Sequence, residues 1–170
     1  MNVILYMAIT VDGLVAKRGG DSSWTSEADW NVFEEITKEA GAVIMGRNTF
    51  EMLQKEGMFP FPDRQNIVMT SRSVEPEWGN VVVMSEPPAE VVRALKERGF
   101  SKAVVIGGAT LAGSFMKEGL INEIYLTVEP IAFGEGMKLF QGGEFEANLD
   151  LLDVKKISDN EVQLHYAVRK

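Results

Sequence analysis

Short apolar runs alternate with helix-like segments along most of this chain, and this alternation constrains the fold more than any other feature. Strands that alternate with amphipathic helices pack as a sheet with helices on both faces. After Thr127 the pattern changes, because two apolar runs are joined directly at residues 158–160, which predicts an antiparallel hairpin. We therefore expect an α/β fold, a three-layer αβα sandwich with a mixed, mainly parallel sheet of about eight strands and a C-terminal antiparallel hairpin. The expected strands are 3–9, 42–45, 66–70, 80–84, 103–106, 121–128, 149–157 and 162–168, and the expected helices are 27–39, 48–55, 88–98 and 110–118.

The composition excludes several classes of function. A length of 170 residues with 45% hydrophobic residues fits one domain that spans residues 1–170. Seventeen Lys and Arg against 25 Asp and Glu give a net charge of −8, which argues against nucleic acid and anionic membranes as partners. The absence of cysteine and the single histidine, His165, lead us to expect no metal site and no cysteine nucleophile. The apolar run at 3–11 is too short to span a bilayer and follows no basic segment, so the sequence predicts a cytoplasmic protein.

One candidate binding segment joins an apolar run to a helix start through Gly46 and carries Arg47, Asn48 and Thr49. Backbone N–H groups at a helix N-terminus attract anions, the Thr49 hydroxyl adds a donor, and the Arg47 guanidinium can bind a phosphate with two hydrogen bonds. The alternative is a plain strand–helix turn in which Asn48 or Thr49 caps the helix and Arg47 is solvated. The residues by themselves leave both interpretations open.

A second junction of the same kind occurs where Gly107 and Gly108 separate an apolar run from a helix. Paired glycines let the backbone approach a ligand closely, although their spacing is not the GxGxxG pattern of Rossmann folds. Two such junctions in one small α/β domain favour a nucleotide-like ligand that lies across the carboxyl ends of the strands. Thr70, Ser71 and Arg72 follow another strand at the same expected edge, where they could bind a further phosphate.

The segment from Trp24 to Phe33 carries an acidic group at the start of a helix. Ser26 and Asp29 stand at capping-box spacing, so Asp29 could simply satisfy the helix terminus. The alternative is that apolar neighbours such as Trp24 and Phe33 raise the pKa of Asp29 and let it supply or relay a proton. The spacing by itself favours the cap.

Taken together and in this order, these segments resemble dihydrofolate reductase over residues 1–127. Trp24, Asp29 and Phe33 have the spacing of that family's substrate-pocket helix, and this trio is fairly specific. The other matching motifs are Ala8-Ile9-Thr10-Val11-Asp12-Gly13, VIMGRNTFE at 43–51, PDRQNI at 62–67, IGG at 106–108 and YLT at 125–127.

The resemblance implies the dihydrofolate reductase-like fold and an enzyme that uses NADPH as its cofactor. The nicotinamide would lie near Ala8 and the paired glycines, the pyrophosphate would lie at Arg47 and Thr49, and Ser71 and Arg72 would hold the 2′-phosphate. The full set of implied cofactor-binding residues is Ala8, Gly46, Arg47, Asn48, Thr49, Thr70, Ser71, Arg72, Ile106, Gly107, Gly108, Ala109, Thr110 and Leu111.

On the substrate side, the resemblance implies hydride transfer to a pterin-type substrate, namely the reduction of dihydrofolate to tetrahydrofolate. Asp29 would bind the pterin ring and support its protonation, with Trp24 as a further catalytic residue and Thr127 hydrogen-bonded to the carboxylate. Arg64 would form a bidentate pair with the α-carboxylate of the substrate's glutamate tail. The remaining implied substrate-binding residues are Tyr6, Met7 and Phe33.

Residues 114–123 and 129–140 resemble a different reductase, the riboflavin-biosynthesis reductase domain, which shares the fold. The alternative function is therefore 5-amino-6-(5-phosphoribosylamino)uracil reductase. Against this alternative, Ile106 replaces the glutamate that usually precedes the paired glycines there, and residues 34–38 lack an expected arginine. A nucleotide-binding module without chemistry is a third possibility, and it would keep the glycine junctions without needing Asp29. Apolar residues on the C-terminal strands could support a homodimer.

Overall fold

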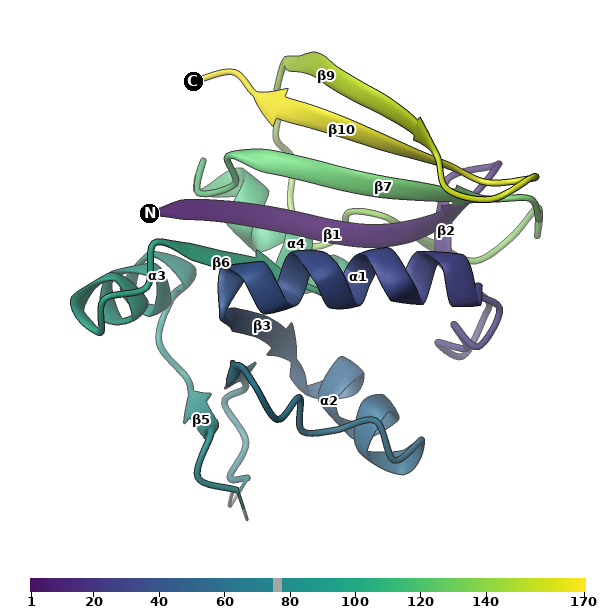
Figure 1. Cartoon of the computed structure of the whole chain (residues 1–170). Helices are drawn as coiled ribbons and strands as arrows, with labels where there is room; N and C mark the ends of the chain where they lie inside the picture. The colour runs from purple at the N-terminus through teal and green to yellow at the C-terminus, as the bar shows by residue number, and fades with distance from the viewer. Residues whose placement is uncertain (75–77) are drawn as a thin grey trace.

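The computed structural model describes residues 1–74 and 78–170, and its centre is one eight-stranded sheet with the order β5-β4-β3-β6-β1-β7-β10-β9 (Figure 1). Neighbouring strands from β5 to β7 run parallel, whereas β10 pairs antiparallel with both β7 and β9. The expected mainly parallel sheet with a C-terminal antiparallel hairpin is therefore confirmed. The sheet strands are β1 (Asn2–Thr10), β3 (Ala42–Gly46), β4 (Gln65–Met69), β5 (Val81–Met84), β6 (Lys102–Val105), β7 (Glu123–Glu129), β9 (Leu149–Lys156) and β10 (Val162–Val168), and the helices are α1 (Glu27–Ala40), α2 (Arg47–Lys55), α3 (Pro88–Glu97) and α4 (Ala109–Lys117).

Two hydrophobic cores lie on opposite faces of this sheet. Along β1, Val3 and Leu5 point into a core that includes Phe115 of α4 and Leu95 of α3. Ile4 and its alternating neighbours point into the second core, which is closed by α1 and α2. Because successive side chains of a strand point to opposite faces, near-continuous apolar runs produce a sheet that is buried on both sides. The three-layer αβα sandwich is confirmed.

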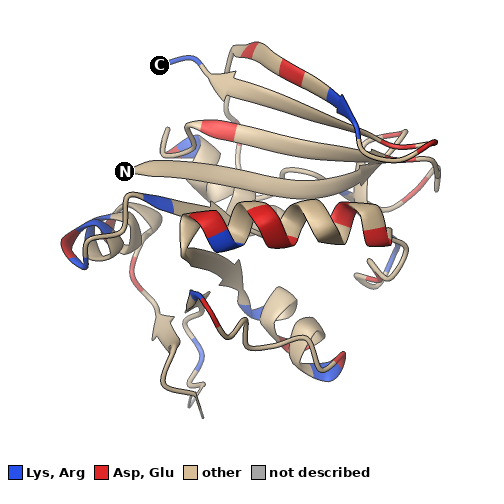
Figure 2. Cartoon of the chain, in the orientation of Figure 1, with Lys and Arg blue, Asp and Glu red and all other residues tan. Residues whose placement is uncertain are grey.

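Helix α1 presents one buried stripe to the sheet, and most of its acidic residues, drawn red in Figure 2, are exposed. Asp29, Phe33, Thr37 and Ala40 are its buried residues, at the three- and four-residue spacing of a helix face. The helix ends at Gly41, whose φ of 74° is the left-handed conformation that glycine adopts without strain. Among residues 1–74 and 78–170, no helix is long and apolar enough to cross a membrane.

A second, two-stranded sheet was not expected from the sequence. It pairs β2 (Leu14–Ala16) with β8 (Met137–Lys138), and strands this short leave no periodic signal. Asp12, in the turn after β1, binds the loop that follows β7, because its carboxylate accepts hydrogen bonds from the backbone N–H groups of Phe133 and Gly134. The turn after β1 and the loop after β7 therefore form one unit next to the start of α1.

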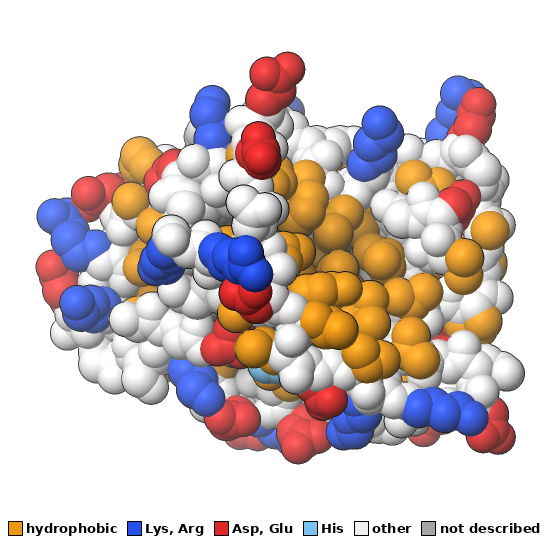
Figure 3. Space-filling view, turned by 90° about the horizontal axis from the view of Figure 1, so that it is seen from above, with side chains coloured by type: hydrophobic (Ala, Val, Ile, Leu, Met, Phe, Trp, Pro, Cys, Tyr) orange, Lys and Arg blue, Asp and Glu red, His pale blue; other side chains and the backbone are white. Residues whose placement is uncertain are grey.

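The edge strand β9 is exposed along its whole length and carries an unusual number of apolar side chains. Figure 3, which views the molecule from above, shows apolar side chains gathered in a hollowed patch. We call the exposed apolar residues of this hairpin the C-terminal apolar patch; they are Leu149, Leu151, Leu152, Val154 and Val162, with exposed fractions from 36% to 56%.

Candidate functional site

The two glycine junctions predicted to bind a nucleotide meet at the carboxyl ends of β3 and β6, which are neighbours in the sheet. The backbone N–H of Gly46 donates a 2.8 Å hydrogen bond to the carbonyl oxygen of Gly107. Gly107 has a φ of 128°, and a Cβ atom there would stand 3.1 Å from Thr49 Oγ1 and 3.8 Å from Met7 Sδ. Met7, Thr49 and Gly107 therefore converge on one place that only a glycine leaves open.

Two helices begin at this place, and neither start is capped by a side chain in the described residues. The N-cap residues are Gly46 for α2 and Gly108 for α4, and neither has a side chain that could bind the N–H groups of the first turn. Asn48 and Thr49 stand inside α2 and do not cap it. The alternative of a plain strand–helix turn capped by one of these two residues is therefore not observed. Uncapped N–H groups with partial positive charge are a suitable site for phosphate groups.

Charged groups stand at the same edge of the sheet. Arg47, in the first turn of α2, forms a 2.8 Å ion pair with Glu51 one turn later and stays partly exposed. Residues 70–72 follow β4, which is the next strand beyond β3, and the Thr70 hydroxyl accepts a hydrogen bond from the backbone N–H of Arg72. Ser71 and Arg72 are both exposed. The expected cofactor residues are thus brought together along the carboxyl ends of β4, β3, β6 and β1.

Asp29 lies in the interior on α1, only 6% exposed. The Tyr6 hydroxyl of β1 donates a 2.7 Å hydrogen bond to Asp29 Oδ1. The Ser26 hydroxyl caps the helix by accepting a hydrogen bond from the Asp29 N–H. The Ser26 N–H, which the Asp29 carboxylate would bind in a capping box, donates instead to Glu129. The carboxylate of Asp29 is therefore not used by its own helix end.

Burial is the main reason that the pKa of Asp29 is raised, and the nearby carboxylate of Glu161 raises it further. The hydroxyls of Thr127 and Tyr6 act in the opposite direction. Burial and the neighbouring Asp29 also raise the pKa of Tyr6, so its hydroxyl keeps its proton and acts as a donor. The result is a buried acid that can hold a proton more readily than an exposed aspartate does.

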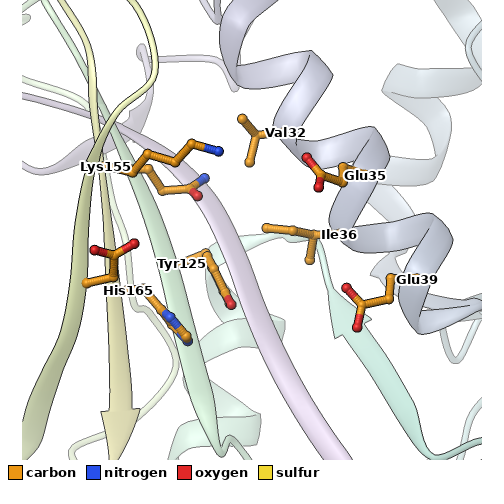
Figure 4. A pocket seen from close by; sticks show the side chains of 9 residues that line it. Val32, Glu35, Ile36, Glu39, Tyr125, Lys155 and His165 are labelled. Atoms are coloured by element: carbon orange, nitrogen blue, oxygen red, sulfur yellow. The ribbon is translucent and has the colours of Figure 1, made fainter.

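Thr127 belongs to the same network, through Tyr6. Its hydroxyl lies 3.4 Å from the Tyr6 hydroxyl, and the Gln163 amide of β10 donates to both oxygens at 3.3 Å. Gln163 also lines a groove of about 240 Å³ between α1 and the C-terminal strands (Figure 4). In this groove Val32, Glu35, Ile36 and Glu39 of α1 face Tyr125, Lys155 and His165 of the sheet.

A pair of buried carboxyl groups, Glu129 and Glu161, lies beside this network, with exposed fractions of 2% and 7%. Burial and the proximity of Glu161 raise the pKa of Glu129 to about 7. Hydrogen bonds from serine side chains keep the pKa of Glu161 below its ordinary value. With a pKa of about 7, Glu129 is partly protonated at neutral pH, whereas the lowered pKa of Glu161 keeps that group ionised.

Arg64, expected to anchor the substrate, pairs with residues of α1 in this structure. Its guanidinium forms a bidentate pair with Glu34, at 3.0 and 2.6 Å, and a 2.9 Å hydrogen bond to Thr37. The side chain is only 1% exposed, against 27% for Glu34. In this structure an internal carboxylate pairs with the guanidinium, and the pairing of Arg64 with a substrate carboxylate stays a prediction.

The aromatic residues expected around the substrate form two groups. Phe33 packs against Tyr6, Trp30 and Phe61, with ring centroids 5.0 to 5.5 Å apart, and is 7% exposed. Trp24 lies instead edge-on to Phe133, at 5.4 Å, in the loops that precede α1 and follow β7. Its indole Nε1 is buried and has no hydrogen-bond partner within the described residues.

Within the described residues, no group of three or more His, Asp or Glu side chains could hold a metal ion. His165, the one histidine, pairs with Glu123 at 2.7 Å and stacks on Tyr125 across the neighbouring strand. The described residues therefore offer hydrogen-bonding and acid–base groups to a ligand.

The model of the RibD C-terminal domain family matches residues 1–163, almost the whole chain. The chain belongs to the RibD C-terminal domain family. The expected kinship with the dihydrofolate reductase fold and with the riboflavin-biosynthesis reductase domain is thereby confirmed.

Three proteins show what this RibD C-terminal domain is similar to. The uncharacterized protein YwjB of Bacillus subtilis is 32% identical over 167 residues, covering 96% of this chain and 95% of YwjB. Dihydrofolate reductase HdrB of Haloferax volcanii is 30% identical over 112 residues, covering 65% of this chain and 57% of HdrB. The crystal structure of a putative riboflavin biosynthesis protein from Shewanella sp. PV-4 superposes with a TM-score of 0.86 at 22% identity, covering 100% of both chains.

Several partners of the predicted site residues in this RibD C-terminal domain gave no signal in the sequence. Tyr6, expected to contact substrate, also donates a hydrogen bond to Asp29. Gln163 and Glu129 come from distant strands, Glu161 directly precedes β10, and none of the three carried a motif signal. Glu34 stands one helical turn and a half from Asp29, but nothing in the sequence indicates that it faces Arg64, which is 30 residues away.

Proposed function

We propose that this chain is an NADPH-dependent reductase that transfers hydride to a pterin-type ring. The observation that carries the proposal is the buried Asp29, whose carboxylate is held by the Tyr6 hydroxyl at 2.7 Å and has no part in capping its own helix. Membership of a family whose relatives include proteins named as reductases supports the same reaction class. Dihydrofolate contains this ring and is the substrate that the sequence resemblance implies.

The residues at the glycine junctions fit a dinucleotide. Gly107 has no side chain where a Cβ would crowd Thr49 and Met7, and the uncapped starts of α2 and α4 offer N–H groups to phosphates. Arg47 would add positive charge near the pyrophosphate, and the exposed Arg72 would bind the 2′-phosphate. When bound, NADPH supplies the hydride.

Asp29 would hold the heterocycle and the proton that it needs. A carboxylate accepts hydrogen bonds from the amino and ring N–H groups of a pterin, and burial strengthens such bonds. Because burial raises the pKa of Asp29, the group can also hold a proton for a ring nitrogen. Tyr6, Thr127 and Gln163 would keep the carboxylate oriented, so they act as positioning residues. Met7 and Phe33 remain proposed as substrate-binding residues, and Trp24 remains proposed as a catalytic residue.

A second candidate is the reduction of 5-amino-6-(5-phosphoribosylamino)uracil, and the family match over residues 1–163 favours it. Its pyrimidine ring also presents N–H groups that a buried carboxylate can accept. Its phosphate, however, needs a cation beyond the ring, and Arg64 is already paired with Glu34. We therefore place this reduction second in the proposal.

The test follows the oxidation of NADPH by the purified protein with dihydropterins, dihydrofolate and the phosphorylated aminopyrimidine in turn. We expect turnover with at least one dihydropterin, and we expect Asp29→Asn to lower kcat by about 100-fold or more, the usual effect of losing a general acid. Glu27→Gln, which removes an exposed acid from the same helical turn, is the matched control and should leave kcat unchanged.

Two outcomes would overturn the proposal. If only the aminopyrimidine is reduced, the second candidate is the function. If NADPH binds, as measured by calorimetry, but no substrate oxidises it, the chain is a nucleotide-binding protein. Equal activity of Asp29→Asn and the wild type would remove Asp29 from the mechanism.

A further inference from the structure

The groove between α1 and the C-terminal strands (Figure 4) has no part in the proposed reaction. None of the nine residues that line it is among those proposed to bind the cofactor or the substrate. Its volume of about 240 Å³ is smaller than the roughly 300–1,000 Å³ of sites that take drug-sized ligands. A molecule that fits this groove is therefore small.

Gln163 lines the groove with a side chain that is almost entirely buried, because the residue is only 5% exposed. Its Nε2 lies 3.3 Å from the Tyr6 hydroxyl. That hydroxyl gives its own proton to Asp29 Oδ1, so it can only accept from Gln163. The orientation of the amide is thereby fixed, with its NH₂ group on the side of Tyr6 and its oxygen free for another partner.

The amide oxygen of Gln163 accepts no hydrogen bond from residues 1–74 or 78–170. Within these residues, the side-chain polar atoms that are both fully enclosed and unpaired are Trp24 Nε1 and Arg64 Nε. The Gln163 oxygen is not one of them, so it is reached from outside, and the groove is where Gln163 meets the surface. A nearly buried acceptor thus faces whatever enters the groove, and it requires an N–H or O–H donor.

The carboxylates of the groove indicate a donor that carries positive charge. Glu35 of α1 and Asp153 of β9 line it from its two sides, and neither forms an ion pair among the described residues. Glu39 lines the same side as Glu35 and is paired with Lys102. Negative charge therefore stands on both sides of the groove, and it favours a cation over an anion or a neutral molecule.

Basic and apolar side chains limit the size and charge of that cation. His165 is already paired with Glu123, at 2.7 Å, whereas Lys155 extends its ammonium group towards Val32 (Figure 4). Lys155 would compete with a bound cation for the same carboxylates. Val32 and Ile36 present apolar surface along α1, on which an alkyl chain can lie.

We propose that this groove is a ligand site for a small organic cation that carries a primary ammonium group on a short alkyl chain. The ammonium N–H groups would donate to the Gln163 oxygen and to the carboxylates of Glu35 and Asp153. The methylene groups would pack on Val32 and Ile36. The site is independent of the proposed reaction, and its test measures binding alone.

The experiment follows the Gln163 side-chain amide of isotope-labelled protein by NMR during titration with putrescine, a four-carbon chain with an ammonium group at each end. Hexamethylated putrescine keeps the chain and both charges but has no N–H group, and butanediol keeps hydroxyl donors but has no charge. We expect a saturable shift with putrescine and at least about tenfold weaker binding of the other two compounds. Equal binding of the hexamethylated compound would refute the role of the Gln163 oxygen, and equal binding of butanediol would refute the role of charge.

Variants with opposite effects separate a built site from general attraction to an acidic protein. Glu35→Gln combined with Asp153→Asn removes the two unpaired carboxylates and should weaken putrescine binding by about tenfold, whereas Lys155→Met removes the competing ammonium and should strengthen it by about threefold. Glu27→Gln combined with Glu144→Gln gives the same net charge as the first variant and should bind as the wild type does. All five positions are exposed, so folding should not be affected. Absence of a saturable shift in the wild type, or equal weakening in the two double variants, would overturn the proposal.

Discussion

The hydroxyl of Tyr6 donates a 2.7 Å hydrogen bond to Asp29 Oδ1 inside the protein, joining the first strand of the chain to the first long helix. This bond stabilises the ionised form of Asp29, whereas burial destabilises that form. The chemistry proposed for Asp29 therefore depends on a group that never needs to touch the substrate.

Tyr6→Phe removes the donor and leaves the ring in place. We expect the pKa of Asp29 to rise, so the pH profile of kcat should shift to higher pH, and the loss of a bond to a charged group should cost about 1.5–3 kcal/mol of stability. The measurements are the pH dependence of NADPH oxidation and urea unfolding. Tyr125→Phe removes a hydroxyl from the neighbouring groove and should change neither; an unshifted pH profile in Tyr6→Phe would refute the positioning role.

Gly107→Ala tests the place where the two glycine junctions meet. The residue has a φ of 128°, and the added Cβ would stand 3.1 Å from Thr49 Oγ1, so we expect a stability loss of about 1–3 kcal/mol and weaker NADPH binding. Calorimetric titration with NADPH measures the second effect. Gly79→Ala, where a Cβ meets nothing within 4 Å, is the control. Wild-type affinity in Gly107→Ala would mean that the cofactor does not approach this backbone.

Arg72→Ala tests the proposed binding of the 2′-phosphate. The 2′-phosphate is the one group that NADH lacks, so the variant should raise KM for NADPH by about tenfold and leave KM for NADH unchanged. The matched control is Arg93→Ala, an exposed arginine on α3 that pairs with Glu90. Equal effects on the two cofactors would contradict the assignment.

Glu129 makes stability depend on pH in a defined direction. The pKa of Glu129 in the folded protein is raised from 4.5 to about 7. Its contribution to the free energy of unfolding is therefore fully present at pH values below 4.5 and is lost as the pH rises towards 7. Asp29, whose pKa is also raised, acts in the same direction. We expect the free energy of unfolding to fall between about pH 5 and about pH 8, measured with urea.

Glu129→Gln isolates this contribution. The amide keeps an oxygen that can accept from the Ser26 N–H and removes the repulsion from Glu161. We expect the variant to be more stable than the wild type at about pH 8 by roughly 1–2 kcal/mol and to lose most of the pH dependence. A wild-type slope in this variant would assign the pH dependence to other groups.

The homodimer expected from the apolar C-terminal strands stays a prediction, and the exposed β9 gives it a physical basis. The strand carries acidic residues at Asp150 and Asp153 and basic residues at its end, Lys155 and Lys156. An antiparallel approach of two copies would set the acidic half of each strand against the basic half of the other. The C-terminal apolar patch adds to this a few hundred Å² of apolar surface, part of the roughly 800 Å² per partner of a typical stable interface.

Sedimentation analysis of the wild type and of Leu151→Glu measures this association. We expect a dimer that the substitution converts to a monomer, because each copy would then have to bury a charged side chain among the apolar residues of the interface. Val11→Glu changes a 68% exposed valine outside the patch and should leave the dimer intact. A monomeric wild type would refute the prediction.

Apolar runs and helical spacing predicted the eight strands of the main sheet and the four helices found in residues 1–74 and 78–170. Most of these strands are buried on both faces and therefore appear as long apolar runs. The rules of parallel sheets also predicted that Gly46 and Gly107 lie at the same edge, and the 2.8 Å hydrogen bond between these residues confirms it. The short strands β2 and β8 could not be predicted, because two or three residues are too few to show a period.

The local sequence determined the elements of this protein and which residue types stand at their ends, because helix and strand formation depend on near neighbours in the chain. Only the tertiary structure decided which side chains meet. Tyr6 reaches Asp29 across 23 residues and Gln163 reaches Tyr6 across 157, distances at which no sequence period operates. The same is true of Glu34, which forms an ion pair with Arg64, a residue 30 positions away in the chain.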